Sequence, residues 1–326
     1  MRSVRFEKFG DPAQVLSVQE TEKPAVGPGM VLVRMRVRPI NPSDVLTVRG
    51  LYGSLPRLPA TPGNEGVGVV EEIGEGVTTY APGQRVIPLG AGSTWQEYVA
   101  VHEMQLMPVP DALSDETAAQ FVVNPLTAWI MVVEDLKVGQ GEWLLQTAAG
   151  STLGQMVLQI AKMRGFRTIN VVRRREQVAE LRALGADEVI CSSDEDIVKR
   201  VMAITDGKGV PYAIDAVGGE VTGQVMRSLS AGGTALIYGV LSLEAVTLDA
   251  THLVFKTPTL RGFWLTRWFQ RTPPETMQRV MGEMLGLLSS GQVTPPVERT
   301  YDLSEVVEAV AHSEQPGRHG KVLLVG

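Results

Sequence analysis

Cysteine is nearly missing from this 326-residue sequence, and its scarcity excludes two kinds of site. Cys191 is the only cysteine, so the chain can form no internal disulfide and no thiolate cage for a metal ion. The four histidines, His102, His252, His312 and His319, are widely scattered along the chain. The sequence therefore predicts a protein without structural zinc.

Long apolar runs and an excess of basic charge are also missing. No apolar run approaches the ~20 residues that cross a bilayer, and the start of the chain, MRSVRFEKFG, lacks the apolar core of a signal peptide. A formal charge of -6 would repel a phosphate backbone. We therefore expect a cytoplasmic protein that binds a small molecule and has neither a membrane nor a nucleic acid as partner.

The pattern of the chain changes near residue 122. Hydrophobic residues make up 44% of the chain, which is enough to fill two cores. Before the change, Pro and Gly are frequent and short strand-like runs recur, such as residues 30–40 and 66–74. These features predict a mostly β lobe in the first third of the chain.

From residue 143 onward, strand, turn and helix patterns alternate, which is typical of a parallel sheet with crossover helices. In the first helical stretch, Leu153, Met156, Val157 and Ile160 recur at helical spacing and form one apolar stripe. The sequence predicts an α/β fold with a doubly wound parallel sheet of six strands. These strands are expected at residues 143–147, 167–172, 188–192, 212–217, 234–239 and 260–264.

The turn after the first of these strands carries a chemical signal. Ala149, Ser151 and Gly154 occupy the spacing of a G-x-G-x-x-G dinucleotide fingerprint, with only the last glycine retained. Small residues let the backbone approach a pyrophosphate, whose charge would lie at the positive end of the following helix. A tight turn without a ligand is the alternative. The predicted dinucleotide contacts are Ala149, Gly150, Ser151, Thr152, Leu153 and Gly154.

Three arginines follow the second strand, where an NAD site would place an acidic side chain. The guanidinium groups of Arg173, Arg174 and Arg175 are planar, always charged and able to donate paired hydrogen bonds to a phosphate. This pattern favours NADPH over NADH, and a solvated basic turn is the alternative. At the carboxyl edge of the same sheet, Tyr238 is a candidate contact for the nicotinamide half.

With these features the chain resembles the medium-chain dehydrogenases/reductases, in which a GroES-like β lobe precedes a Rossmann domain and the substrate binds between the two. The resemblance implies a GroES-like catalytic domain at residues 1–122 plus 268–326. It implies a Rossmann NADPH-binding domain at residues 123–267.

The zinc ligands of the alcohol-oxidising members are replaced in this sequence. Their GHEGxG segment has Asn64 in place of the histidine, and Asn41 begins the segment that resembles C-H-T-D. The third ligand position falls near Asn124. Because Asn supplies neither thiolate nor imidazole, the resemblance implies that catalytic zinc is absent.

Within this superfamily, several phrases resemble the mitochondrial-type 2-enoyl thioester reductases more than the quinone reductases. They are NPSD (41–44), GLYG (50–53), LPATPGNEGV (58–67), NPLTAW (124–129), RTINVVR (167–173) and GFWLTRW (262–268). The resemblance assigns catalysis to Tyr52 and ties Trp264 to the substrate pocket. Asn41 is predicted to assist catalysis, and Asn64 and Trp95 are predicted in the pocket, with capping of a turn as the alternative for Asn64. The further cofactor contacts that the resemblance implies are Asn124, Thr127, Tyr238, Phe263, Trp264 and Lys321.

The implied reaction is NADPH-dependent reduction of the carbon-carbon double bond of a trans-2-enoyl thioester. Negative charge develops on the thioester oxygen, and the phenol of Tyr52, protonated at neutral pH, could hold that oxygen or protonate the α-carbon. Without the resemblance, a tyrosine beside glycines is more often an aromatic plug of a loop.

Three functions remain open at this point. The chain is expected to reduce enoyl-CoA or enoyl-ACP, or else to reduce quinones or small enones, or else to bind NADPH without catalysis. The resemblance also implies a homodimer, paired through the last strand of the Rossmann sheet near residues 260–264.

Overall fold

The structure is a computed structural model that describes residues 1–326, and its backbone contacts divide the chain into two compact units. Unit 1 consists of Met1–Asn124 and Thr294–Gly326, and unit 2 is Pro125–Val293. The chain therefore returns to unit 1 at residue 294, whereas the sequence placed this return at residue 268.

The helix α11, Pro274–Ser289, accounts for the later return, because it lies within unit 2. Its buried residues, Val280, Met284 and Leu288, recur at a spacing of four and form one apolar stripe. Such a stripe shows that a helix must cover an apolar surface, but it carries no information about which lobe provides that surface.

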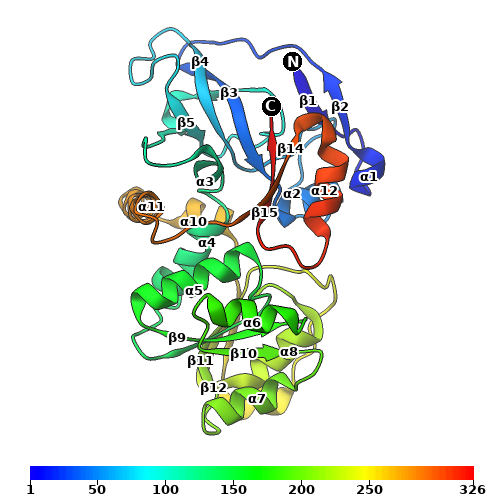
Figure 1. Ribbon diagram of the computed structural model, residues 1–326, viewed down its shortest axis with the longest axis vertical. Helices are drawn as coiled ribbons and strands as arrows, with labels where there is room; N and C mark the ends of the chain where they lie inside the picture. The colour runs from blue at the N-terminus through cyan, green and yellow to red at the C-terminus, as the bar shows by residue number, and fades with distance from the viewer. The chain divides into compact units, whose positions relative to one another are not determined.

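Unit 1 is the mostly β lobe that the sequence predicts (Figure 1). A seven-stranded sheet has the order β14-β15-β3-β4-β5-β7, with β6 also paired to β3, and β1 and β2 form a separate antiparallel ribbon. The ladder between β14 and β15 is parallel, whereas the other ladders of this sheet are antiparallel. The strands are β1 (Arg2–Arg5), β2 (Ser17–Glu20), β3 (Met30–Pro39), β4 (Val67–Ile73), β5 (Arg85–Pro88), β6 (Tyr98–His102), β7 (Leu106–Pro108), β14 (Val297–Asp302) and β15 (Lys321–Val325).

Short helices connect or cover these strands. The helix α2 follows the long strand β3 directly, and α12 precedes the terminal strand β15. The helices of unit 1 are α1 (Pro12–Val15), α2 (Pro42–Val48), η1 (Glu103–Gln105), α3 (Asp115–Ala119), η3 (Leu303–Glu305) and α12 (Val306–Glu314). The helix α4, Asn124–Trp129, begins at the last residue of the first segment of unit 1 and continues into unit 2.

Unit 2 contains the six-stranded parallel sheet that the sequence predicts, in the order β10-β9-β8-β11-β12-β13. The order reverses beside β8, and crossover helices lie on both faces, with α5 on one side of the strands and α7 on the other in Figure 1. The strands are β8 (Trp143–Gln146), β9 (Arg167–Val172), β10 (Glu188–Cys191), β11 (Val210–Asp215), β12 (Leu229–Ile237) and β13 (Thr259–Gly262).

The first crossover helix, α5 (Thr152–Arg164), forms where the apolar stripe predicts it. Met156, Val157 and Ile160 have no exposed surface, and the helix ends at Gly165, whose φ of 75° suits a left-handed cap. No helix of the structure is long and apolar enough to span a bilayer. The remaining helices of unit 2 are η2 (Ile130–Asp135), α6 (Glu176–Ala183), α7 (Ile197–Ile204), α8 (Gly219–Ser228), α9 (Ala250–Lys256), α10 (Leu265–Arg271) and α11 (Pro274–Ser289).

Candidate active site

Unit 1 buries a cluster of amide and charged side chains around Asn41, which lies between β3 and α2 and is 1% exposed. The Oδ1 atom of Asn41 accepts hydrogen bonds from Nζ of Lys321 at 2.8 Å and from Nδ2 of Asn124 at 3.2 Å. Its Nδ2 group donates to Oε1 of Glu65 at 2.8 Å. The structure thus brings together three residues that the sequence assigned to catalysis or cofactor binding, Asn41, Asn124 and Lys321.

Glu65 lies at the centre of this cluster, and the sequence analysis did not identify it as a site residue. Its side chain is fully buried, and Oε2 accepts from the backbone N–H groups of Val122 and Val123 at 2.9 and 2.8 Å. Burial raises the pKa of Glu65, while these hydrogen bonds and the nearby charge of Lys321 oppose the rise. An acidic residue directly before the apolar stretch GVGVV was the available signal.

Asp44 adds a second buried carboxyl group on the first turn of α2. It accepts from the backbone N–H of Asn41 at 2.8 Å and from Nδ2 of Asn64 at 2.6 Å. Burial raises the pKa of Asp44 to about 7. Asn64 also donates to the hydroxyl of Ser43 at 3.1 Å. Its side chain, which was predicted in the substrate pocket, therefore binds to α2.

Lys321 is the basic member of the cluster, at the first position of β15. Burial lowers the pKa of Lys321 to about 8, and the Coulombic attraction of Glu65 and Asp44 opposes this change. The polar groups around Asn41 are therefore amides, two carboxyl groups and an ammonium group. An ammonium bonded to the amide oxygen does not fit a zinc ion at this place, and nowhere in the chain are three or more His, Cys, Asp or Glu side chains arranged so that they could hold a metal ion.

Tyr52 lies in the loop that α2 holds. The backbone N–H groups of Gly50 and Leu51 donate to Thr47 and Leu46 of α2 at 3.0 and 2.8 Å, which closes the helix directly before Tyr52. Gly50 has a φ of 75°, a conformation that glycine adopts without steric cost. The tyrosine itself is half-buried. The cluster around Asn41 thus fixes the start of the helix whose end carries the predicted catalytic loop.

The candidate dinucleotide turn in unit 2 joins β8 to α5. Ala148 has a φ of 47°, a left-handed conformation that costs a non-glycine residue about 1–2 kcal/mol. Ser151 caps α5, because its Oγ accepts from the N–H of Gly154 at 3.1 Å. A Cβ atom on Gly154 would lie 2.4 Å from the carbonyl oxygen of Ala149, so the last glycine of the fingerprint is required for the first turn of α5 to pack against the preceding turn.

Polar side chains inside the sheet support this turn. Asp215, at the end of β11, accepts from the hydroxyl of Thr147 at 2.5 Å and also from the hydroxyl of Thr222 and the N–H of Gly218. The hydroxyl of Tyr238 is buried near Asp215 without a hydrogen-bond partner, and its burial raises the pKa of this phenol. A buried donor without a partner is costly, which fits a ligand contact at this position.

The three arginines after β9 differ in their surroundings. Arg175 is bound to Asp194, with a distance of 2.8 Å from Nε to Oδ2. Arg173 is exposed and Arg174 half-buried, and neither guanidinium forms an ion pair with a carboxylate. Arg173 and Arg174 are therefore the two arginines whose charges are available to a phosphate.

The remaining predicted site residues are Thr127, Phe263, Trp264 and Trp95. Thr127 is 7% exposed within α4, and Phe263 and Trp264 are half-buried between β13 and α10, where Trp264 lies 5.8 Å from the guanidinium of Arg267. Trp95, predicted in the substrate pocket, has no exposed surface and packs in the core of unit 1 with Phe6 and Val48. In this structure the ring of Trp95 is therefore part of the hydrophobic core.

Two family descriptions match the chain. Residues 27–111 match the alcohol dehydrogenase GroES-like domain, and residues 152–284 match the zinc-binding dehydrogenase family. The matched ranges fall within unit 1 and unit 2, respectively.

Similar proteins cover the whole chain. The mitochondrial enoyl-[acyl-carrier-protein] reductase of Bos taurus is 37% identical over 99% of this chain and 88% of its own length. A mitochondrial 2-enoyl thioester reductase heterodimer from Candida tropicalis is 29% identical with a TM-score of 0.87, covering 100% of this chain and 99% of that chain. The Escherichia coli quinone oxidoreductase, in complex with NADPH, is 26% identical with a TM-score of 0.91 and covers 100% of both chains.

The names of the curated relatives correct the prediction of a cytoplasmic protein. The relatives from cattle, rat and human are mitochondrial enzymes. The cytoplasmic prediction was wrong because it rested on the absence of an apolar leader, whereas sequences that direct mitochondrial import are amphipathic and rich in arginine. An apolar run is therefore no test of that destination.

The variant Asp44→Asn tests the charge state of the buried cluster. Burial raises the pKa of Asp44 from 3.8 to about 7, so between these values the folded protein binds a proton that the unfolded chain has released. The contribution of Asp44 to the free energy of unfolding is therefore present at acid pH. It is lost as the pH rises through this window, by at most roughly 1.4 kcal/mol per pH unit. In urea denaturation, the free energy of unfolding of the wild type should fall relative to that of Asp44→Asn as the pH rises from about 4 to about 7. A difference between the two proteins that is independent of pH would contradict the assignment.

Proposed function

Because the chain belongs to the zinc-independent medium-chain dehydrogenases/reductases, with the enoyl-[acyl-carrier-protein] reductases and quinone oxidoreductases, we propose that it reduces trans-2-enoyl thioesters with NADPH. The chain is an oxidoreductase. The observation that carries the choice of substrate is the 37% identity to an enoyl-[acyl-carrier-protein] reductase over 99% of the chain.

The residues of unit 2 fit a bound NADPH. Ser151 and the N-terminus of α5 would face the pyrophosphate, because the small residues of the turn allow the backbone to approach it. Arg173 and Arg174, which have no carboxylate partner, would bind the 2'-phosphate. The unpartnered hydroxyl of Tyr238 supports a contact to the nicotinamide half. When bound, NADPH supplies the hydride for the β-carbon of the substrate.

Residues of unit 1 would stabilise the negative charge that the reduction creates. As the β-carbon gains a hydride, negative charge accumulates on the thioester oxygen and a proton must reach the α-carbon. The phenol of Tyr52 can donate a hydrogen bond to that oxygen or the proton to that carbon. Asn41, whose amide is held by Glu65 and Lys321, would position the helix before Tyr52 rather than react itself.

We also infer that two copies of the chain associate through the edge strand β13. This strand lies at the end of the sheet, and apolar side chains near it in the sequence are exposed, with Val254 at 66% and Phe255 at 82%. The relative from Candida tropicalis is itself a heterodimer. Covering these side chains would remove apolar surface from water.

The variant Tyr52→Phe tests the proton donor. It should lower kcat for crotonyl-CoA by about 100-fold, because loss of one preorganised donor costs about 3 kcal/mol of barrier. The Kd of NADPH, measured by fluorescence titration, should stay unchanged. Steady-state oxidation of NADPH with crotonyl-CoA, a longer trans-2-enoyl-CoA and 1,4-benzoquinone gives the rates. Unchanged turnover of crotonyl-CoA in the variant would refute the role of Tyr52, and quinone turnover with inert thioesters would assign the chain to the quinone oxidoreductases.

The variants Arg173→Gln and Arg174→Gln test the choice of cofactor. Each should raise the KM for NADPH about tenfold, because a charge-assisted hydrogen bond contributes about 1.5–3 kcal/mol, and should leave the KM for NADH unchanged. Arg175→Gln is the matched control, since its guanidinium is already bound to Asp194. Equal effects on the two cofactors, or a larger effect at Arg175, would argue against phosphate recognition by this turn.

The variant Phe255→Asp tests the pairing of chains. A carboxylate at this exposed apolar position should convert a dimer to monomers in sedimentation velocity, because the charge would have to be buried at the contact. Met104→Asp is the control, since Met104 is equally exposed, at 83%, but lies in unit 1. A wild-type protein that is monomeric, or a dimer that persists in Phe255→Asp, would overturn the inference.

A further inference from the structure

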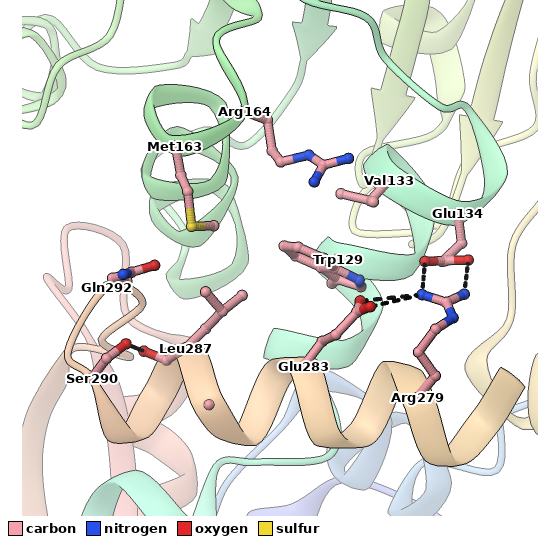
Figure 2. Close-up of a pocket in the computed structure, with 11 residues that line it drawn as sticks. Trp129, Val133, Glu134, Met163, Arg164, Arg279, Glu283, Leu287, Ser290 and Gln292 are labelled. Carbon is pink, nitrogen blue, oxygen red and sulfur yellow. Dashed lines mark hydrogen bonds and ion pairs between the residues drawn. The ribbon is translucent and has the colours of Figure 1, made fainter. Parts of the chain in front are cut away.

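Unit 2 has a cavity that the proposed reaction does not use (Figure 2). It lies among the C-terminal end of α5, the segment from α4 to η2, and α11. Its volume of about 680 Å³ falls within the ~300–1,000 Å³ that small-molecule sites usually have. The turn with Ser151 is at the opposite end of α5, so the cavity is separate from the candidate dinucleotide site.

The wall of the cavity is largely apolar. Trp129, Val133, Met163 and Leu287 contribute aromatic, branched and thioether surface from four different elements. Met163 is 37% exposed although it is a large apolar residue, which leaves apolar surface uncovered at the cavity. A ligand for this wall needs an apolar body.

Two hydrogen-bond donors at the cavity have no acceptor. Trp129 is only 5% exposed, and its indole N–H is buried without a hydrogen-bond partner. The guanidinium of Arg164 lies 5.7 Å from the Trp129 ring and forms no ion pair. A cation–π attraction at this distance leaves the N–H groups of an arginine free to donate. The indole N–H of Trp129 and the exposed guanidinium of Arg164 therefore have no protein acceptor, and both suit a ligand with acceptor atoms.

Both acidic groups of the cavity are bound by one cation, Arg279. Arg279 binds Glu134 through two hydrogen bonds of 3.0 and 2.7 Å and binds Glu283 at 3.1 Å, as the dashed lines in Figure 2 show. These contacts raise the pKa of Arg279 above its usual value. With both carboxylates held by Arg279, the cation left for an incoming ligand is Arg164.

The backbone beside the cavity is also unusual. Val133 and Glu134 belong to η2, a π-helix at Ile130–Asp135 that directly follows α4. Such helices are rare and occur frequently at functional sites. The π-helix ends the segment that carries the indole of Trp129, so it contributes to the shape of the wall.

We propose that this cavity binds an amphipathic monocarboxylate, such as the anion of a medium-chain fatty acid. The carboxylate would accept hydrogen bonds from Arg164 and the indole N–H of Trp129, and the chain would lie against Val133, Met163 and Leu287. The site would hold its ligand without chemistry, apart from the site proposed for enoyl thioesters.

Isothermal titration calorimetry with sodium decanoate, below its micelle concentration, tests the proposal on the full chain saturated with NADPH. The wild type should bind one decanoate per chain with saturable heat. Arg164→Gln should weaken binding at least tenfold, because the carboxylate loses its charged partner. Leu287→Ser should also weaken it, through the lost apolar wall, and 1-decanol should bind more weakly than decanoate.

Lys162→Gln is the matched control, because Lys162 is an exposed cation on the same helix that does not line the cavity. It should bind decanoate as tightly as the wild type. Absence of saturable binding to the wild type would overturn the proposal, and so would equal weakening in Arg164→Gln and Lys162→Gln. Saturable binding that Arg164→Gln leaves unchanged would place decanoate elsewhere, for example in the acyl pocket of the active site, and would also refute the cavity as its site. None of these outcomes depends on turnover, so the proposed reduction is tested separately.

Discussion

Asn41 and Lys321 are joined by a hydrogen bond of 2.8 Å although 280 residues separate them in the chain. Both side chains are buried, so each must find its partners inside the protein. Through Asn41, the start of α2, the segment before β4, the first residue of α4 and the first residue of β15 are held together. The predicted catalytic loop depends on this set of bonds, because it follows the helix that the set anchors.

In unit 2, a buried polar side chain likewise joins separate segments, here at the carboxyl ends of the strands. Asp215 is buried and receives hydrogen bonds from Thr147, Thr222 and two backbone N–H groups, so the turn after β8 and the loop after β11 are fixed to each other. These ends lie where open α/β sheets bind their ligands. The strained Ala148 persists at this turn because the surrounding hydrogen bonds over-determine its conformation.

The arginines of the chain differ in whether a protein group already binds them. Arg175 and Arg279 are bound to carboxylates, and Arg38 is buried with backbone carbonyls as its acceptors. Arg173 and Arg174 lack carboxylate partners, and so does Arg164. A paired guanidinium has little remaining attraction for a ligand anion, so the two proposed anion sites use arginines that have no carboxylate partner.

The sequence by itself determined the architecture of this protein. Hydrophobic periodicity predicted all six strands of the parallel sheet and the helix at 153–164, because burying one face of each element imposes a local repeat. The motif resemblance likewise predicted the family. Only the tertiary structure decided which polar residues meet: Glu65 and Asp44 joined the cluster of Asn41, Arg175 was bound by Asp194, and Trp95 was placed in the core. It also placed α11 in unit 2. These outcomes depend on contacts between residues far apart in the chain, and a local pattern carries no record of its distant partner.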